Sequence, residues 1–101
     1  MSQIETDKKF SLGRIVSTPG ALHALHQAGQ SADEFLSRHV CGDWGDLDDE
    51  DKSLNDKALS DGSRLLSAYV SRTGDWLYVI TEATNDVGLR YCTTILLVSE
   101  Y

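Results

Sequence analysis

The sequence is poor in cysteine and proline and has no long apolar run. Its two cysteines, Cys41 and Cys92, are too few for the disulfide framework of a small secreted domain. No apolar stretch approaches the roughly 20 residues that a membrane-spanning helix needs. The opening MSQIETDKKF has no apolar segment after its lysines, so it does not predict a secretory signal. We therefore expect a cytoplasmic protein that does not enter a membrane.

Basic residues are also scarce, with 9 Lys and Arg against 16 Asp and Glu and a net charge of −7. The imbalance is concentrated in residues 41–62, CGDWGDLDDEDKSLNDKALSDG, which hold eight acidic and two basic side chains. A chain of this charge repels nucleic-acid phosphates, so we expect no direct binding of DNA or RNA. The acidic stretch would instead attract a basic surface of another protein.

Length and composition predict a single globular domain over residues 1–101, with a flexible N-terminus over 1–9. Strand-forming residues gather at one N-terminal position and in the last third of the chain. The predicted order is β-α-α-α-β-β-β, an α+β domain whose antiparallel meander carries the helices on one face. The predicted strands are FSLGRIV (10–16, with Gly13 as a bulge), RLLSAYVS (64–71), WLYVITEA (76–83) and YCTTILLVS (91–99).

Capping signals mark the three helices. Thr18 and Pro19 begin the first helix and Gly29 ends it. Ser31 and Glu34 match a capping box, which predicts a second helix over 32–40. The third helix is predicted to begin with Asp48 to Asp51 in its first turn, where the helix dipole favours negative charge, and to end at Gly62.

The acidic stretch is the best candidate for a functional surface. Its carboxylates can stand in for phosphates and meet arginine side chains bidentately. Trp44 has two expected roles, a core residue with its indole N–H bonded or an exposed anchor for a partner. A rival interpretation is that the acids only cap a helix and keep the domain soluble. The predicted partner-binding residues are Asp43, Trp44, Asp46, Asp48, Asp49, Glu50, Asp51 and Asp56.

Catalytic and metal-binding signatures are absent from the sequence. His23, His26, His39 and Cys41 invite a metal hypothesis, but their spacing matches none of the standard zinc patterns. We therefore predict no catalytic residue, no metal and no cofactor, which favours a role other than that of an enzyme.

An enzymatic alternative stays open because helices followed by an antiparallel meander are the outline of barnase-like and RelE-like ribonucleases and toxins. RNA cleavage needs a positioned acid–base pair and cations that stabilise the phosphate charge. The residues available for that chemistry are Arg64, Arg72, Glu82, Arg90, Tyr91 and Thr93.

Five short segments carry a family resemblance: GRIVSTPGAL (13–22), GDWGDL (42–47), ITEA (80–83), TTILL (93–97) and the final Glu100-Tyr101. The chain resembles a family of small proteins found on plasmids, phages and other mobile elements. Members of that family have a shorter link between ITEA and TTILL, usually with an aspartate–arginine pair. This chain has Asp86 and Arg90 separated there, and Ser99 stands where the family has proline. The resemblance implies a mobile-element setting and no particular activity.

Together these observations favour an anti-defence protein, such as an anti-CRISPR or anti-restriction inhibitor. It would act by occupying the basic surface of a host nucleic-acid-binding complex with a face that mimics nucleic acid. The sequence leaves open whether two copies pair through an exposed strand edge to form a homodimer.

Overall fold

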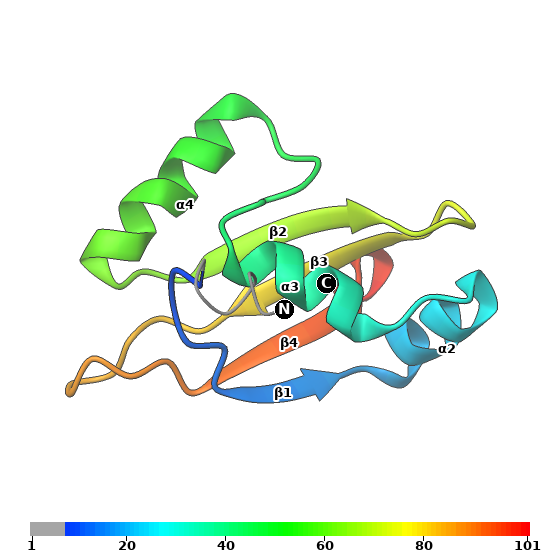
Figure 1. Ribbon diagram of the computed structural model, residues 1–101, viewed down its shortest axis with the longest axis horizontal. Coiled ribbons are helices and arrows are strands. Elements are labelled where there is room, and N and C mark those ends of the chain that lie inside the picture. Colours follow the sequence, from blue (N-terminus) through cyan, green and yellow to red (C-terminus); the bar gives the residue numbers. More distant parts are fainter. Residues whose placement is uncertain (1–7) are drawn as a thin grey trace.

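The computed structural model describes residues 8–101, which form an α+β fold with three α-helices and a four-stranded mixed sheet (Figure 1). The α+β class is therefore as predicted. The elements in chain order are β1 (Arg14–Ser17), α2 (Pro19–Ala28), α3 (Ala32–Val40), α4 (Asp49–Asp61), β2 (Leu65–Val70), β3 (Trp76–Thr81), β4 (Cys92–Leu97) and the 3-10 helix η1 (Val98–Glu100).

The first strand departs from the predicted antiparallel meander. Strands β2, β3 and β4 do form a meander, but β1 lies beside β4 and runs parallel to it, giving the order β1-β4-β3-β2. The helical crossover after β1 returns the chain to the end of the sheet at which β1 begins, so β2 runs in the same direction as β1. The two hairpins that follow then leave β4 running in the same direction as β1. A purely antiparallel sheet was therefore the wrong expectation.

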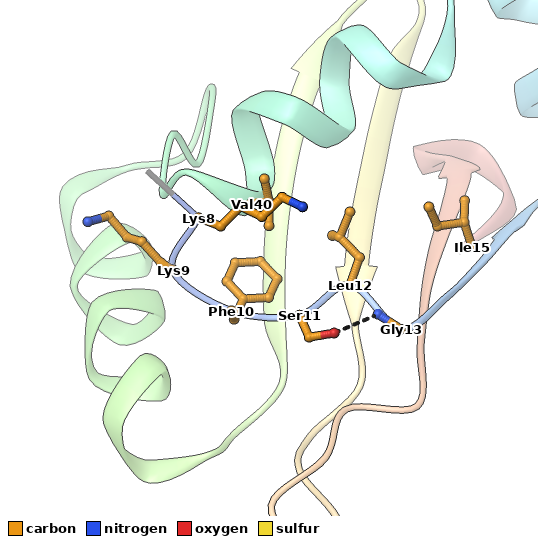
Figure 2. Close-up of a pocket in the computed structure, with 8 residues that line it drawn as sticks. All are labelled: Lys8, Lys9, Phe10, Ser11, Leu12, Gly13, Ile15 and Val40. Carbon is orange, nitrogen blue, oxygen red and sulfur yellow. Dashed lines mark hydrogen bonds between the residues drawn. The ribbon is translucent and has the colours of Figure 1, made fainter. Parts of the chain in front are cut away.

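The predicted strand over 10–16 begins four residues later, at Arg14. The residues before Arg14 pass the C-terminal end of α3, and the side chains of Phe10 and Leu12 lie near that of Val40 (Figure 2). Gly13 has a φ of +66°, and a Cβ there would lie 2.5 Å from the carbonyl oxygen of Tyr91. Gly13 therefore marks a close approach of two backbones rather than a bulge.

The core lies between α2, α3 and one face of the sheet. Alternate residues of β2, β3 and β4 point to this face, and most of them are buried. The opposite face is more open, with Trp76 48% exposed and Val16 42% exposed. The main core cluster consists of Ala21, Leu25, Phe35, Leu36, Tyr69, Leu77, Val79 and Ile95.

Helix α4 lies outside the edge strand β2 rather than over the sheet face (Figure 1). The Asn55 side chain donates to the main-chain oxygen of Leu66 (2.7 Å) and accepts from its N–H (3.1 Å). Next along the edge, the N–H of Ala68 donates to the oxygen of Trp44, and the N–H of Asp46 donates to the oxygen of Ala68. These bonds close an edge that would otherwise expose unpaired backbone groups. The expectation that all helices pack on one face was wrong for α4.

The helix caps are mostly as predicted. Thr18 accepts from the N–H of Ala21 at the start of α2, and Gly29 ends that helix in the left-handed region. The capping box at Ser31 is wrong, because its side chain makes no cap bond and Glu34 instead accepts from Gln30. Most of the predicted flexible segment 1–9 lies outside the described residues.

Candidate functional site

Five of the predicted partner-binding carboxylates gather where α4 begins. The group comprises Asp46, Asp48, Asp49, Glu50 and Asp51, all exposed, and is called the acidic end of α4 below. The bond from the Asp46 N–H to β2 fixes the chain before the helix. Asp48 is the N-cap, and its Oδ1 accepts from the N–H of Asp51 (2.8 Å). The next three acids occupy the first turn, where the helix dipole stabilises negative charge.

The acidic end is not neutralised by the described part of the chain. The single ion pair within residues 8–101 joins Arg38 to Asp43, which lies outside this group. Asp46, Asp49 and Glu50 make no side-chain hydrogen bond within those residues. Their charges are therefore available to a partner.

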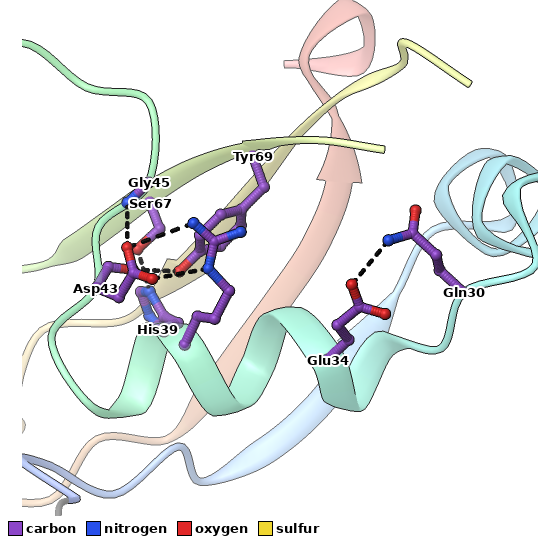
Figure 3. Close-up of polar contacts among 8 residues, drawn as sticks. Gln30, Glu34, His39, Asp43, Gly45, Ser67 and Tyr69 are labelled. Atoms are coloured by element: carbon purple, nitrogen blue, oxygen red, sulfur yellow. Dashed lines mark hydrogen bonds and ion pairs between the residues drawn. The ribbon is translucent and has the colours of Figure 1, made fainter. Parts of the chain in front are cut away.

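Asp43 is turned toward its own chain. Its Oδ2 accepts from Nε of Arg38 (2.8 Å), and its Oδ1 accepts from the N–H of Gly45 (3.1 Å; Figure 3). The hydrogen bond from Arg38 holds the pKa of Asp43 below its ordinary value. The same guanidinium lies 4.5 Å from the ring centre of Tyr69, whose O–H donates to the main-chain oxygen of Asp43 (2.6 Å). Asp43 thus fixes the turn after α3 and is not part of the acidic end.

Trp44 takes the first of its two expected roles. Its side chain is 4% exposed and packs against the rings of Phe10 and His39. The indole N–H donates to Oδ1 of Asp56 (3.0 Å), which engages a second predicted partner-binding carboxylate. Little of Trp44 is left for a partner to contact.

A buried polar chain centred on His39 was not predicted. Nδ1 of His39 lies 2.6 Å from Oγ of Ser67, and Nε2 lies 2.8 Å from Oγ1 of Thr81. Thr81 lies 2.7 Å from Thr93, whose hydroxyl donates to the main-chain oxygen of Leu12 (2.7 Å). The spacing offered a signal, because His39 lies between Leu36 and Val40 on the buried stripe of α3.

The direction of the hydrogen bonds follows from that last donor. Because Thr93 gives its proton to a carbonyl, Thr81 donates to Thr93 and Nε2–H of His39 donates to Thr81. In a neutral ring that carries its proton on Nε2, Nδ1 accepts from the Ser67 hydroxyl. Burial, aided by the positive charge of Arg90, lowers the pKa of His39 to about 4.

The Ser67–His39 contact has the length of a nucleophile–base pair but cannot meet a substrate as it stands. Both side chains are fully buried, and both ring nitrogens of His39 are engaged. His23 and His26 lie on α2 and are exposed. No three His, Cys, Asp or Glu side chains come together as metal ligands within residues 8–101.

The three arginines among the ribonuclease candidates make their contacts in different parts of the fold. Arg90 is 8% exposed, and its guanidinium donates to three main-chain oxygens. Thr93 is fully buried. Arg64 donates to the hydroxyl of Tyr101, whereas Arg72 contacts the loop after α2. The three arginines thus make structural contacts, whereas Glu82 and Tyr91 are exposed.

Comparisons with protein-family models, with curated protein sequences and with solved structures find no match to this chain. The resemblance to mobile-element proteins therefore stays a prediction from the sequence. Among residues 8–101, no helix combines the length and apolar character needed to cross a bilayer.

Proposed function

We propose that this protein acts by binding, and that the acidic end of α4 occupies a basic, nucleic-acid-binding surface of another protein. The observation that carries the proposal is that five exposed carboxylates gather there and residues 8–101 supply none of them with an ion pair. Arginine side chains that hold phosphates have the geometry to hold carboxylates bidentately. The protein would then compete with a polynucleotide for its partner.

The position of α4 favours this use. Asn55 and Ala58 anchor the helix to the sheet through β2 and its neighbourhood, so the acids project from a rigid element. A preorganised charged surface loses less entropy on binding than a mobile tail would. The mobile-element resemblance supplies the setting, that of an anti-CRISPR or anti-restriction inhibitor.

A second candidate role for these acids is structural. The bond from the Asp51 N–H to Asp48 favours it, because that carboxylate is engaged as a helix cap. Acids in the first turn also stabilise the helix by about 0.3–1 kcal/mol each at low salt. On this hypothesis they contribute to stability and make no contact with a partner.

A matched pair of variants separates the two roles. Asp49→Asn with Glu50→Gln removes two charges from the first turn of α4, and Asp33→Asn with Glu34→Gln removes two from the first turn of α3. Each bait is immobilised, exposed to host lysate at low salt, and eluted with duplex DNA. We expect the α4 variant to lose about tenfold or more of the DNA-eluted partner, because each hydrogen bond to a charged group contributes about 1.5–3 kcal/mol.

The α3 variant is the control, and we expect it to retain the partner. High salt should release the partner from the wild-type bait, because exposed charges are screened. If both variants capture the same DNA-eluted protein as wild type does, the acidic end is not the binding surface. If both variants are destabilised to the same extent but capture the partner as wild type does, the structural role is favoured.

A further inference from the structure

The edge of the sheet at β1 is open, unlike the edge at β2. The N–H groups of Arg14 and Thr18 donate to Tyr91 and Ile95, so these residues face β4. Ile15 and Ser17 are out of phase with them, and their main-chain N–H and C=O groups point away from the sheet. Those groups have no partner within the described residues. An open strand edge is a template for a further strand.

A groove lined by both apolar and basic side chains adjoins this edge. It has a volume of about 610 Å³ and contains no carboxylate among its lining residues. Figure 2 shows the aromatic ring of Phe10 and the side chain of Leu12 in the groove, with Ile15 at its β1 end. Ile15 is 50% exposed, so the groove continues onto the strand that would receive a partner. The lining residues are Lys8, Lys9, Phe10, Ser11, Leu12, Gly13, Ile15 and Val40.

The same segment is basic in an otherwise acidic protein. Residues 8–17 read KKFSLGRIVS, with three cations and no acid, whereas the whole chain carries a net charge of −7. Lys8, Lys9 and Arg14 are exposed, and none of them forms an ion pair within the described part of the chain. This charge complements an acidic ligand and repels a second copy of the same edge.

We propose that β1 receives an extended, acidic segment of another protein as a fifth strand of the sheet. The main chain of the segment bonds to Ile15 and Ser17, and its alternate apolar side chains lie in the groove on the face of Ile15. Its carboxylates lie on the other face, with Arg14, and are also attracted by Lys8 and Lys9. Main-chain bonds give affinity in such strand addition, and side-chain pockets give specificity. The strand-addition site and the acidic end of α4 lie on different elements and prefer partners of opposite charge. Either proposal can therefore fail while the other holds.

The probe is a fluorescein-labelled octapeptide of alternating valine and glutamate, followed by fluorescence anisotropy with the full chain. Two control peptides replace glutamate with lysine or carry N-methyl groups on alternate backbone nitrogens. We expect the acidic peptide to bind at least about tenfold more tightly than either control, because only it has both the charge and the strand donors.

Two protein variants complete the test. Ile15→Pro removes an N–H that the sheet does not use and blocks strand addition, so we expect at least about a tenfold loss. Asp49→Asn with Glu50→Gln should bind the peptide as wild type does, which keeps this result separate from the proposed function. Amide hydrogen exchange at Ile15 and Ser17 should slow when the peptide is added to wild type, a readout that needs no variant to fold.

Equal affinity for the acidic and N-methylated peptides would overturn the proposal, as would unchanged exchange at Ile15 and Ser17. If these two amides are already protected in the free chain, the edge is covered by a second copy or by residues 1–7. Sedimentation at several protein concentrations then identifies the occupant, and the peptide-binding role is wrong in either case.

Discussion

Acidification should destabilise this protein well above the pH at which its carboxylates titrate. The buried ring of His39 is neutral, with a pKa lowered from 6.5 to about 4, mainly because burial disfavours its charged form. The unfolded chain binds a proton on this residue as the pH falls through 6.5, whereas the folded chain does not. The contribution to stability is therefore fully present above pH 6.5 and is lost as the pH falls toward about 4.

The magnitude follows from the shift in pKa. The difference between the two pKa values corresponds to about 3 kcal/mol in full. Between about pH 7 and about pH 5 the loss is about 2 kcal/mol. The carboxyl of Asp43, whose pKa is lowered by its bond from Arg38, adds a loss only below its ordinary value of 3.8, which is a separate window.

The measurement is urea unfolding at a series of pH values, followed by tryptophan fluorescence, which comes from the exposed Trp76 and from Trp44, packed against His39. His39→Gln should lower stability at neutral pH and flatten the dependence above about pH 5, because no buried imidazole remains to be protonated. The double variant His23→Gln, His26→Gln is the control and should keep the wild-type slope. A wild-type stability that is constant between about pH 7 and about pH 5 would refute the burial argument.

Two further predictions concern the covered edge of β2, and both are measured as free energies of unfolding. Gly45→Ala should cost about 2–3 kcal/mol, because Gly45 has a φ of +77° and a new Cβ would lie 2.0 Å from the oxygen of Ala68. Gly74→Ala, with a φ of +89° and no atom within 4 Å, should cost only about 1 kcal/mol, and equal losses would contradict the close-approach argument. Asn55→Ala should cost about 2 kcal/mol by unpairing the main chain of β2, and a loss near zero would mean that water replaces the amide.

Local signals in the sequence predicted the helices well. Thr18, Gly29 and Gly62 each end or begin a helix because of backbone chemistry that acts within a few residues. The arrangement of β1 was less predictable, because its parallel pairing with β4 joins residues, such as Arg14 and Cys92, that are separated by more than half the chain. The capping box at Ser31 failed because Gln30, its neighbour, bonds Glu34 instead.

The position of the candidate site was easier to predict from the sequence than the residues that belong to it. The acids of the first turn of α4 are exposed because a helix N-terminus stabilises them without a cation. Asp56 could not be assigned from the sequence, because its bond to Trp44 joins residues on different segments. Arg38 and Asp43 are only five residues apart, yet their pairing needs the turn that Gly45 completes.

Net charge is a coarse guide to partners, because it averages over surfaces that the fold keeps apart. The total of −7 predicted attraction to basic proteins alone. The fold places five exposed acids at the start of α4, beyond β2, and a segment whose only charges are cationic at β1, the opposite edge of the sheet. Since screening limits exposed charges to about 8–10 Å at physiological salt, each surface acts on what lies next to it. On the two proposals, the edges therefore select partners of opposite charge, and the basic edge also offers free main-chain strand donors.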